Sequence, residues 1–349
     1  MTGVLTLAKG KVIAKHWRIT KRLGKGSFGA VYQVKHIHNR EEAALKVEVI
    51  RKDGQASVLK LEAHILRRLA HCHLFANVIQ TGKKSTYSYM VMSLLGASLD
   101  TLIGKSGSIC TVSTQIRVGI NALCALKALH DMGFIHRDIK PANMAVGVND
   151  RARIIHIFDF GLARQYVIFG EGHKPKLRRP RKKARFRGTY RYCSINTHSR
   201  GEQGRDDDLW SLLYTLVEMR GKLPWANEYT DEVIHHFKKV TPIDDLLANC
   251  PFQLLEFAQH LETLNYYIRP DYSLLYQTME DVRKVGHIKY SDPYDWEQEE
   301  FERLSAEKVK RKNHSVDRTQ ASATAITAEK DEEHNPFPIE FFTSNPLGF

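Results

Sequence analysis

The stretch FIHRDIKPANMAVG, residues 134–147, carries the most information about the fold. It places a carboxylate at Asp138, an ammonium group at Lys140 and a side-chain amide at Asn143. A D-F-G motif begins at Asp159, sixteen residues after Asn143. Each residue alone would suggest only a surface polar group. The ordered combination H-R-D-x-K-x-x-N and then D-F-G is a strong and specific signal.

These residue types fit one chemistry, the transfer of a phosphoryl group to a hydroxyl. Asp138 can accept or orient the proton of the attacking hydroxyl, and Lys140 can neutralise charge on the transferred group. Asn143 and Asp159 supply oxygen atoms, which are the ligands that Mg²⁺ prefers, with Mn²⁺ as an alternative. The sequence therefore predicts Asp138 and Lys140 as catalytic residues, and Asn143 and Asp159 as metal ligands.

A glycine-rich segment nearer the N-terminus supplies a candidate phosphate contact. Glycine has no Cβ, so the backbone at Gly24, Gly26 and Gly29 can approach a phosphate closely. The same spacing occurs in dinucleotide-binding folds, but those require a helix directly after the glycines and an acidic residue about twenty positions later. Here a strand pattern follows, and a lysine lies where the acid is expected. The predicted loop comprises Gly24, Lys25, Gly26, Ser27, Phe28 and Gly29.

Two further residues are expected beneath this loop. The stretch AALK places Lys46 on a strand within reach of phosphates, although an exposed strand lysine is the alternative. Glu62 follows sixteen residues later on a helical pattern. A carboxylate from a neighbouring helix holds the lysine of such phosphate sites. A solvent-facing glutamate is the alternative for Glu62.

The order of strand-like and helix-like patterns predicts two lobes. From Trp17 onward, apolar and polar residues alternate as in strands. From Ser113 onward, apolar residues recur at helical spacing. A mostly β segment followed by a mostly α segment favours two lobes with a cleft between them. After about Glu300 the chain is polar and unpatterned, so disorder is expected, although the aromatic end PFPIEFFTSNPLGF can also dock on the domain or on a partner.

Charge and composition exclude several classes of protein. The 349 residues carry a net charge of +13, and eleven basic residues with no acidic one lie between His173 and Gly201. Proteins that coat nucleic acid usually spread positive charge over a face or over several segments, so this local excess argues against them. No apolar run predicts a membrane span, and no secretory signal is apparent. The five scattered cysteines fit reduced thiols in an intracellular protein.

The chain resembles the eukaryotic protein kinases from about Trp17 to Trp296. The lysine two residues after Asp138 is typical of the serine/threonine branch, and MVMSLLGASLDTL and SINTH are similar to the casein kinase I family. Within it, PRKKARFRGTYRYCS and RDDDLWSLLYTLVE are most similar to the tau-tubulin kinases. The resemblance implies an α+β bilobal kinase fold. Its expected parts are an N-terminal extension at 1–16, a kinase domain at 17–298 (small lobe about 17–92, hinge 93–95, large lobe 96–298) and a largely disordered tail at 299–349.

The resemblance also implies roles for matching residues. Met92 would be the gatekeeper at the back of the adenine pocket, and residues 93–95 would bind adenine through backbone groups. Asp208 would hold the catalytic loop through backbone N–H groups. Because SINTH replaces the usual A-P-E, the usual glutamate–arginine anchor of the activation segment is expected to be missing. The predicted adenine residues are Leu23, Val31, Ala44, Met92, Ser93 and Leu95.

The basic segment lies within the activation and substrate-docking region that the resemblance defines. Its cations favour substrates with acidic or phosphorylated residues near the target hydroxyl. By resemblance, Arg191 belongs to an anion pocket whose second cation falls near His236 or Lys238. A solvated loop without selectivity, or a nuclear-import or RNA contact, are the alternatives. The predicted substrate-anion residues are Lys182, Lys183, Arg185, Arg187 and Arg191.

These observations together predict a monomeric, cytoplasmic serine/threonine protein kinase that uses ATP and Mg²⁺, with a nuclear location also open. Its expected partners are acidic or phosphorylated proteins, and no membrane or nucleic acid is expected as the main partner. The alternatives are a kinase-shaped binding module without activity and a nucleic-acid-binding protein. For Thr189, a regulatory phosphate and a purely buttressing role are both open.

Overall fold

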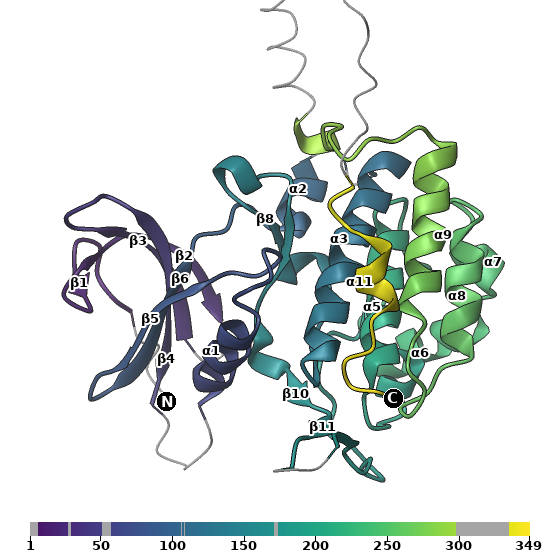
Figure 1. Cartoon of the computed structure of the whole chain (residues 1–349), viewed down its shortest axis with the longest axis horizontal. Helices are drawn as coiled ribbons and strands as arrows, with labels where there is room; N and C mark the ends of the chain where they lie inside the picture. The colour runs from purple at the N-terminus through teal and green to yellow at the C-terminus, as the bar shows by residue number, and fades with distance from the viewer. Residues whose placement is uncertain are drawn as a thin grey trace, which may run out of the picture.

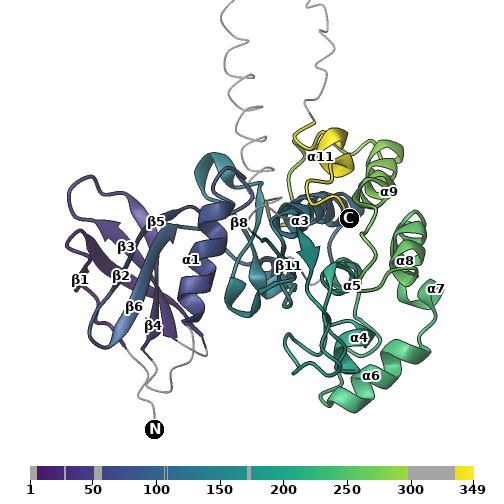
Figure 2. The ribbon, with the colours of Figure 1, turned by 60° about the horizontal axis from the view of Figure 1, so that its bottom comes forward.

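The computed structural model describes residues 6–26, 29–50, 57–105, 107, 109–170, 174–297 and 335–349. Within these ranges the chain forms a small lobe built on one sheet and a large, mainly helical lobe (Figure 1). The two-lobed α+β fold predicted from the sequence is confirmed. In the turned view, helix α1 (Val58–Arg68) lies between the sheet and the large lobe (Figure 2).

The small lobe contains an antiparallel sheet of six strands in the order β1-β2-β3-β4-β6-β5. Its strands are β1 (Val12–Ile13), β2 (Trp17–Gly26), β3 (Gly29–His36), β4 (Glu42–Val49), β5 (Val78–Lys83) and β6 (Tyr87–Ser93). Alternate side chains of β3 are buried, as expected for a strand with one face on a core. The register pairs Val31 with Lys46 and Ala44 with Met92, so predicted phosphate and adenine residues become neighbours.

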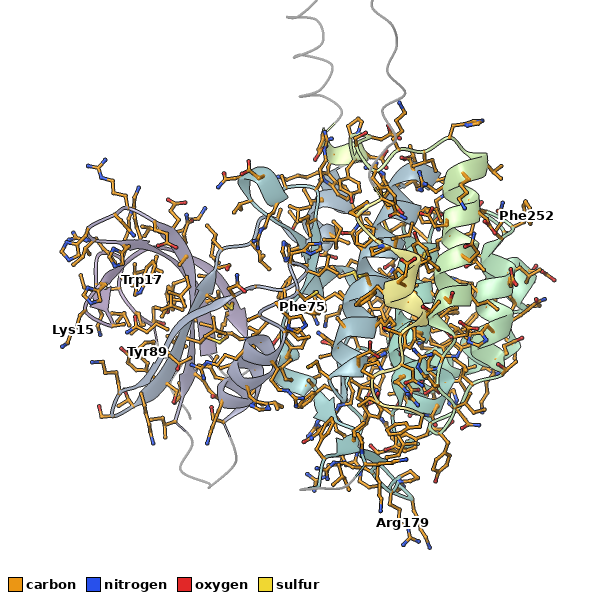
Figure 3. The ribbon with its side chains drawn as sticks, viewed as in Figure 1. Lys15, Trp17, Phe75, Tyr89, Arg179 and Phe252 are labelled. Carbon is orange, nitrogen blue, oxygen red and sulfur yellow. The ribbon has the colours of Figure 1, made fainter. Side chains whose placement is uncertain are left out.

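Residues before β2 take part in the small-lobe core. Leu7 is 5% exposed, and its N–H donates a hydrogen bond of 3.0 Å to the hydroxyl of Tyr32. The buried ring of Trp17, labelled in Figure 3, belongs to the same cluster. Part of the expected N-terminal extension therefore packs as one side of the small lobe.

Helix α1 begins with a side-chain cap. The Ser57 hydroxyl accepts a hydrogen bond of 3.2 Å from the N–H of Lys60, which satisfies one of the free N–H groups of the first turn. The Glu48 carboxylate, from β4, accepts from the N–H groups of Val58 and Leu59 at 3.0 and 3.1 Å. These contacts fix α1 against β4, and Glu62 on its buried face is 1% exposed.

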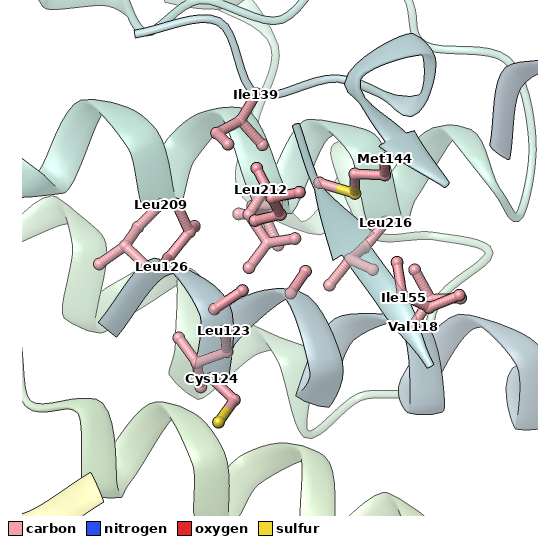
Figure 4. Packing of buried hydrophobic residues seen from close by; sticks show 14 of the residues in the cluster. Val118, Leu123, Cys124, Leu126, Ile139, Met144, Ile155, Leu209, Leu212 and Leu216 are labelled. Carbon is pink, nitrogen blue, oxygen red and sulfur yellow. The ribbon is translucent and has the colours of Figure 1, made fainter. Parts of the chain in front are cut away.

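The large lobe is built around one long, mostly buried helix, α3 (Val112–Asp131). Its helices are α2 (Leu99–Lys105), α3 (Val112–Asp131), α4 (Ile195–His198), α5 (Arg205–Glu218), α6 (Asp231–Val240), α7 (Ile243–Leu246), α8 (Leu254–Glu262), α9 (Tyr272–Val285) and α11 (Ile339–Thr343). Leu123 and Leu126 of α3 pack in one buried cluster with Leu209 and Leu212 of α5 (Figure 4). Ile139 of the predicted catalytic stretch lies in the same cluster, so the core supports the site directly.

The remaining elements of the large lobe are short strands and turns, some of which carry the motif residues. They are β7 (Phe134–Ile135), η1 (Pro141–Asn143), β8 (Met144–Val146), η2 (Asn149–Arg151), β9 (Ile155–Ile157), η3 (Phe160–Leu162), β10 (Arg164–Gln165), β11 (Val167–Ile168), β12 (Lys176–Leu177) and η4 (Asp295–Glu297). Strand β8 pairs with β9, and β7 pairs with β10. The H-R-D-x-K-x-x-N stretch therefore forms a loop between two anchored strands, β7 and β8.

The last fifteen described residues, 335–349, adopt the docked alternative that the aromatic end of the chain left open. Helix α11 packs against α9 (Figure 1, yellow), and Phe337, Phe342 and Leu347 are buried. The apolar side chains that looked unusual for a loose end therefore cover the large lobe. The rest of the predicted tail up to residue 334 lies outside the described residues.

Two expectations from composition concern membranes and cysteines. In the parts of the chain that the structure describes, no helix has the length and apolar character to cross a membrane. All five cysteines are in the reduced form. Burial raises the pKa of Cys72, Cys124 and Cys250, and that of Cys193 to about 12, so these thiols are weak nucleophiles.

Candidate active site

A buried carboxylate holds the loop between β7 and β8. Asp208, in the first turn of α5, is 1% exposed and accepts hydrogen bonds from the backbone N–H groups of His136 and Arg137, each at 2.7 Å. Burial alone would raise the pKa of Asp208, but the hydrogen bond from His130 and the backbone hold it below its ordinary value. Asp208 therefore stays ionised and fixes the start of the loop.

The backbone of this loop is held in an uncommon conformation. Arg137 has a φ of 71°, in the left-handed region that non-glycine residues rarely adopt. Its guanidinium donates a hydrogen bond of 2.6 Å to the carbonyl of Leu162. Burial, together with neighbouring arginines, lowers the pKa of Arg137 to about 10. Such a conformation persists only where surrounding contacts enforce it, so the loop depends on its anchors.

Asp138 lies at the centre of a hydrogen-bond network. Lys140 Nζ is 2.9 Å from Asp138 Oδ2, and Asn143 Nδ2 donates to the same oxygen at 3.0 Å. Thr189 Oγ1 donates to Asp138 Oδ1 at 2.7 Å and accepts from Lys140 Nζ at 2.8 Å. The catalytic loop and the basic segment therefore meet at one carboxylate. This geometry favours the buttressing role of Thr189.

The predicted lysine lies between two carboxylates. Lys46 Nζ is 2.6 Å from Glu62 Oε2 and 2.9 Å from Asp159 Oδ1. Burial acts to lower the pKa of Lys46, but the two carboxylates outweigh it and raise the pKa above its ordinary value. Burial likewise opposes ionisation of Asp159, yet Lys46 lowers its pKa. The Lys46–Asp159 pair is therefore charged at neutral pH, and neither Lys46 nor Glu62 is the exposed strand or helix residue of the alternative interpretation.

The D-F-G turn is anchored by an aromatic ring. Phe160 is fully buried, and its ring centroid lies 5.9 Å from that of Phe75 and 5.2 Å from that of His136. Phe75 is labelled between the two lobes in Figure 3. Asp159 has a φ of 65°, and its side chain remains 48% exposed. The buried phenylalanine thus presents the aspartate to the cleft in a fixed orientation.

A cavity of about 260 Å³ joins these groups beneath the glycine-rich strands. Its lining includes Gly29, Lys46, Glu62, Asp138, Lys140 and Asp159. At Gly29 a Cβ would lie 1.7 Å from the carbonyl oxygen of Val47, so only glycine fits there. A larger cavity of about 580 Å³, lined by residues of α1, β4 and β5, contains none of the catalytic groups. Ser27 and Phe28 of the predicted loop lie outside the described residues.

The predicted adenine residues lie on β2, β3, β4 and β6 and just after β6. Leu23 is 45% exposed on β2, whereas Ala44 is buried on β4 beside Met92. At the hinge, the N–H of Ser93 donates to the carbonyl of Asn77 at 2.9 Å, and the Asn77 N–H donates to the Ser93 hydroxyl at 3.1 Å. Of the six adenine residues, only Val31 also lines the 260 Å³ cavity, which therefore covers the phosphate end.

Four of the five predicted substrate-anion residues are exposed cations. They are Lys182, Lys183, Arg185 and Arg187. Within the described ranges they form no ion pair with Asp or Glu, whereas Arg181 and Arg200 in the same segment are both paired. Lys174, Lys176 and Arg179 of the same segment are exposed as well, so the four predicted residues are among the cations that can meet an external anion.

The fifth predicted residue and its expected partner have internal contacts. Arg191 Nη2 lies 2.7 Å from Glu218 Oε1. Lys238 is 6% exposed and donates to the backbone carbonyls of Tyr190 and Cys193 at 2.7 and 2.5 Å. Both cations of the anion pocket that the resemblance suggested, Arg191 and Lys238, are therefore already bound to groups of the protein.

A glutamate–arginine anchor of the segment was not foreseen from the sequence. The Glu202 carboxylate accepts from Arg181 Nε at 2.5 Å and Nη2 at 2.7 Å, and Arg164 Nε lies 3.2 Å away. The usual anchor was expected to be missing with A-P-E, but this pair ties the basic segment down. The signal available in the sequence was that Glu202 is the first acidic residue after the basic run.

His130 is a second residue that the sequence did not single out. Its Nδ1 is 2.6 Å from the Tyr272 hydroxyl, and its Nε2 is 2.9 Å from Asp208. Burial lowers the pKa of His130, so the imidazole is neutral. It links α9 to the carboxylate that holds the catalytic loop. On the helical pattern of α3 it looked like any other buried position.

The oxygen atoms near Asp138 fit a divalent metal ion. The Asn143 amide nitrogen donates to Asp138, which leaves its oxygen as the atom for a metal, and Asp159 supplies a half-exposed carboxylate. Elsewhere in the described chain, no group of three or more His, Cys, Asp or Glu side chains can hold a metal. Mg²⁺ favours this kind of site, in which two protein oxygens are ligands and phosphate and water complete the coordination shell.

Known proteins with similar sequences agree with this geometry. Residues 17–273 match the family model described as the protein kinase domain. The chain is 42% identical over 356 aligned positions to a Caenorhabditis elegans protein named as a serine/threonine-protein kinase, with 99% of each chain covered. It is 38% identical over 252 positions to an inactive tau-tubulin kinase of the same organism, covering 69% of this chain and 87% of that one.

A more distant relative is casein kinase I homolog 1 of Schizosaccharomyces pombe. The identity is 30% over 298 positions, covering 82% of this chain and 66% of that protein. The similarity to the casein kinase I family and the tau-tubulin kinases predicted from the motifs is confirmed.

Proposed function

The chain belongs to the protein kinase family and is a serine/threonine protein kinase, and on that premise we propose that it transfers the γ-phosphoryl group of ATP to acidic or already phosphorylated protein segments. One observation carries the proposal. Lys46, Asp138, Lys140 and Asp159 line a single interlobe cavity, and Asn143 bonds to Asp138. These are the groups that phosphoryl transfer requires, arranged as two contacting sets around one cavity.

Asp138 acts on the attacking hydroxyl. Its carboxylate orients the Ser or Thr hydroxyl and takes its proton as the oxygen bonds to the γ-phosphorus and the bond to the β–γ bridging oxygen breaks. Lys140, 2.9 Å from Asp138, neutralises negative charge on the transferred group. Thr189 keeps both side chains in place through its two hydrogen bonds.

The remaining groups position the nucleotide. Lys46 holds its phosphates, and Glu62 keeps the Lys46 side chain extended toward them. Asn143 and Asp159 would hold Mg²⁺, which when bound neutralises charge on the phosphate oxygens. Leu23, Val31 and Ala44 offer apolar contacts for adenine, and Asp208 keeps the catalytic loop rigid while the substrate enters.

The preference for acidic or phosphorylated substrates rests on the exposed cations. Lys182, Lys183, Arg185 and Arg187 precede Thr189, whose hydroxyl contacts Asp138. Because the chain leads from these cations to Thr189 at the active site, we infer that their positive potential reaches the target hydroxyl and attracts anionic side chains near it. Arginine can bind a carboxylate or phosphate in a bidentate manner.

A transfer assay tests the proposed function. Purified protein is incubated with γ-labelled ATP, Mg²⁺ and casein, and phosphoserine and phosphothreonine are quantified. Wild type is expected to exceed Asp138→Asn by about 10²–10⁴-fold, the usual contribution of acid–base catalysis. Equal incorporation by both proteins, or none by wild type, would overturn the proposal.

A kinase-shaped binding module remains the rival, since one relative is named as an inactive kinase. The two functions differ in their response to nucleotide. An active site with Asn143 and Asp159 in place predicts that ATP raises the melting temperature more with Mg²⁺ than with EDTA. A module with a vestigial site would show no shift under either condition.

A further inference from the structure

The C-terminal segment, residues 335–349, forms part of the large lobe. Phe342 of α11 is fully buried, and its ring stacks on Tyr276 of α9 with 4.2 Å between centroids. Phe337 is also buried, and its ring centroid lies 5.7 Å from that of Tyr290, beyond the end of α9. These aromatic contacts anchor the first half of the segment.

The middle of the segment satisfies a buried charge. Lys127 of α3 is fully buried, and its Nζ donates to the Ser344 hydroxyl at 2.8 Å and to Asp131 at 2.5 Å. The carbonyl of Ser344 accepts a hydrogen bond of 2.7 Å from Arg269. A buried ammonium group is costly without partners, so Ser344 ties the segment to the helix that precedes the catalytic loop.

The end of the segment reaches the back of the catalytic loop. Leu347 is 8% exposed and belongs to a small apolar cluster with Ile135, Tyr166 and Val167. Ile135 directly precedes His136, whose N–H is held by Asp208. Leu347 therefore belongs to the same packed cluster as Ile135, on the strand that leads into the loop.

The same cluster is connected to the second anchor of the loop. The Tyr166 hydroxyl donates to the carbonyl of His130 at 2.8 Å, and His130 contacts Asp208. A change in the packing of Tyr166 therefore acts on both the backbone before the loop and the carboxylate that fixes it.

We propose that Leu347 is a positioning residue for catalysis, which acts through Ile135 and Tyr166 to hold the loop that carries Asp138. The loop needs this support because Arg137 has a strained backbone, which persists only while its surroundings enforce it. Removing the Leu347 side chain leaves a cavity beside Ile135, into which the strand can relax. Phe337 and Phe342 anchor the segment and do not contact this cluster in the described chain.

The test compares Leu347→Ala with Phe337→Ala in the full-length protein. Amide hydrogen exchange of residues 134–140 is the direct readout, because it reports local opening without requiring activity. Leu347→Ala is expected to exchange about tenfold faster there, whereas Phe337→Ala keeps the wild-type rate in this stretch. Leu347→Met, which nearly preserves volume, should restore the wild-type rate.

Steady-state kinetics give the second readout, which rests on the proposed function. Leu347→Ala should lower kcat about tenfold with the KM for ATP within about twofold of wild type, because small displacements of catalytic groups cost rate rather than nucleotide binding. Phe337→Ala should lower the melting temperature while kcat stays near the wild-type value. If wild type itself is inactive, the proposed function fails, and the exchange experiment still decides the role of Leu347.

Two results would overturn the inference. One is unchanged exchange at residues 134–140 in a folded Leu347→Ala protein. The other is the same acceleration in Phe337→Ala at matched loss of melting temperature, because the effect would then be a general loss of stability. If Leu347→Ala does not fold, Leu347→Val replaces it as the variant with the smaller side chain, and Leu347→Met remains the volume-preserving control. The same two results would then overturn the inference.

Discussion

The cleft and the basic segment beside it use charge in opposite ways. In the cleft, Lys46 and Lys140 each lie within 3 Å of a carboxylate, and their side chains are only 21% and 22% exposed. In the segment, Lys182, Lys183 and Arg185 are exposed and, among the described residues, without an acidic partner. The charged side chains of the cleft are therefore held in place by partners within the protein. The exposed cations of the segment are instead available to pair with acidic groups of a binding partner.

A second contrast lies within the segment itself. Arg181, Arg191 and Arg200 are paired with Glu202, Glu218 and Asp231. These pairs tie the segment to the large lobe, while the exposed cations remain free for substrate. Positive charge in one stretch of sequence thus serves two purposes, and only the fold separates them.

The largest effect is expected in the cleft. Lys46→Met removes the cation between Glu62 and Asp159 and should lower kcat/KM by about 10²–10³-fold, as loss of a preorganised charge in an active site does. Lys21→Met, an exposed lysine on β2, is the matched control and should be neutral. If both variants have the same kcat/KM for one substrate, the paired lysine of the cleft and the exposed lysine of β2 do not differ in function as described.

Loss of the segment anchor should have a smaller effect. Glu202→Gln leaves Arg181 and Arg164 without their carboxylate. Because both arginines are partly exposed, we expect a loss of about 1–2 kcal/mol in unfolding free energy, below the value for a fully buried pair. Activity toward protein substrates should fall with it, and Glu256→Gln on the exposed face of α8 is the control. Equal stabilities in urea would show that Glu202 is no anchor.

The buried amino group of Lys238, beneath the basic segment, should make the free energy of unfolding depend on pH. Burial lowers its pKa to about 8 from an ordinary value of 10.5. Between these values the unfolded chain binds a proton that the folded chain does not, so stability rises with pH in this window. From pH 7 to 9.5, wild type should gain about 1–2 kcal/mol relative to Lys238→Met. Parallel curves for the two proteins would indicate an accessible lysine.

The smallest effect is expected from the exposed cations. Lys182→Ala/Lys183→Ala should lower kcat/KM for an acidic Ser peptide about three- to tenfold, since exposed charge pairs contribute up to about 1 kcal/mol each. A peptide with glutamine in place of the acidic residues should be unaffected, and added salt should reduce the difference. Lys9→Ala/Lys11→Ala removes equal charge from the small lobe as a control. A loss of the same size with both peptides would argue against recognition of anions.

The sequence predicts those parts of the site that depend on local spacing. Asp138, Lys140 and Asn143 lie on one short loop, so their proximity follows from the motif itself. The contact of Lys46 with Glu62 follows from a strand beside a helix. Long-range partners are different, because Glu202 and His130 acquire their roles only when distant elements pack together.

Two regions depend on tertiary packing that the local sequence leaves open. The polar part of the tail lacks a pattern and predicts disorder, whereas docking of its aromatic end was an open alternative, and Phe337, Phe342 and Leu347 of that end are buried. Arg191 looked free because its partner, Glu218, lies at the far end of another helix. In both cases tertiary packing decided what local composition left open.

The most direct test of the account measures two properties of one Asp138→Asn preparation. Proton transfer is the role of Asp138, and nucleotide binding that of Lys46, Asn143 and Asp159. The variant should therefore have a dissociation constant for Mg²⁺–ATP within about threefold of wild type, together with a single-turnover transfer rate at least about 10²-fold lower. Loss of both properties, or of neither, would contradict this division of roles.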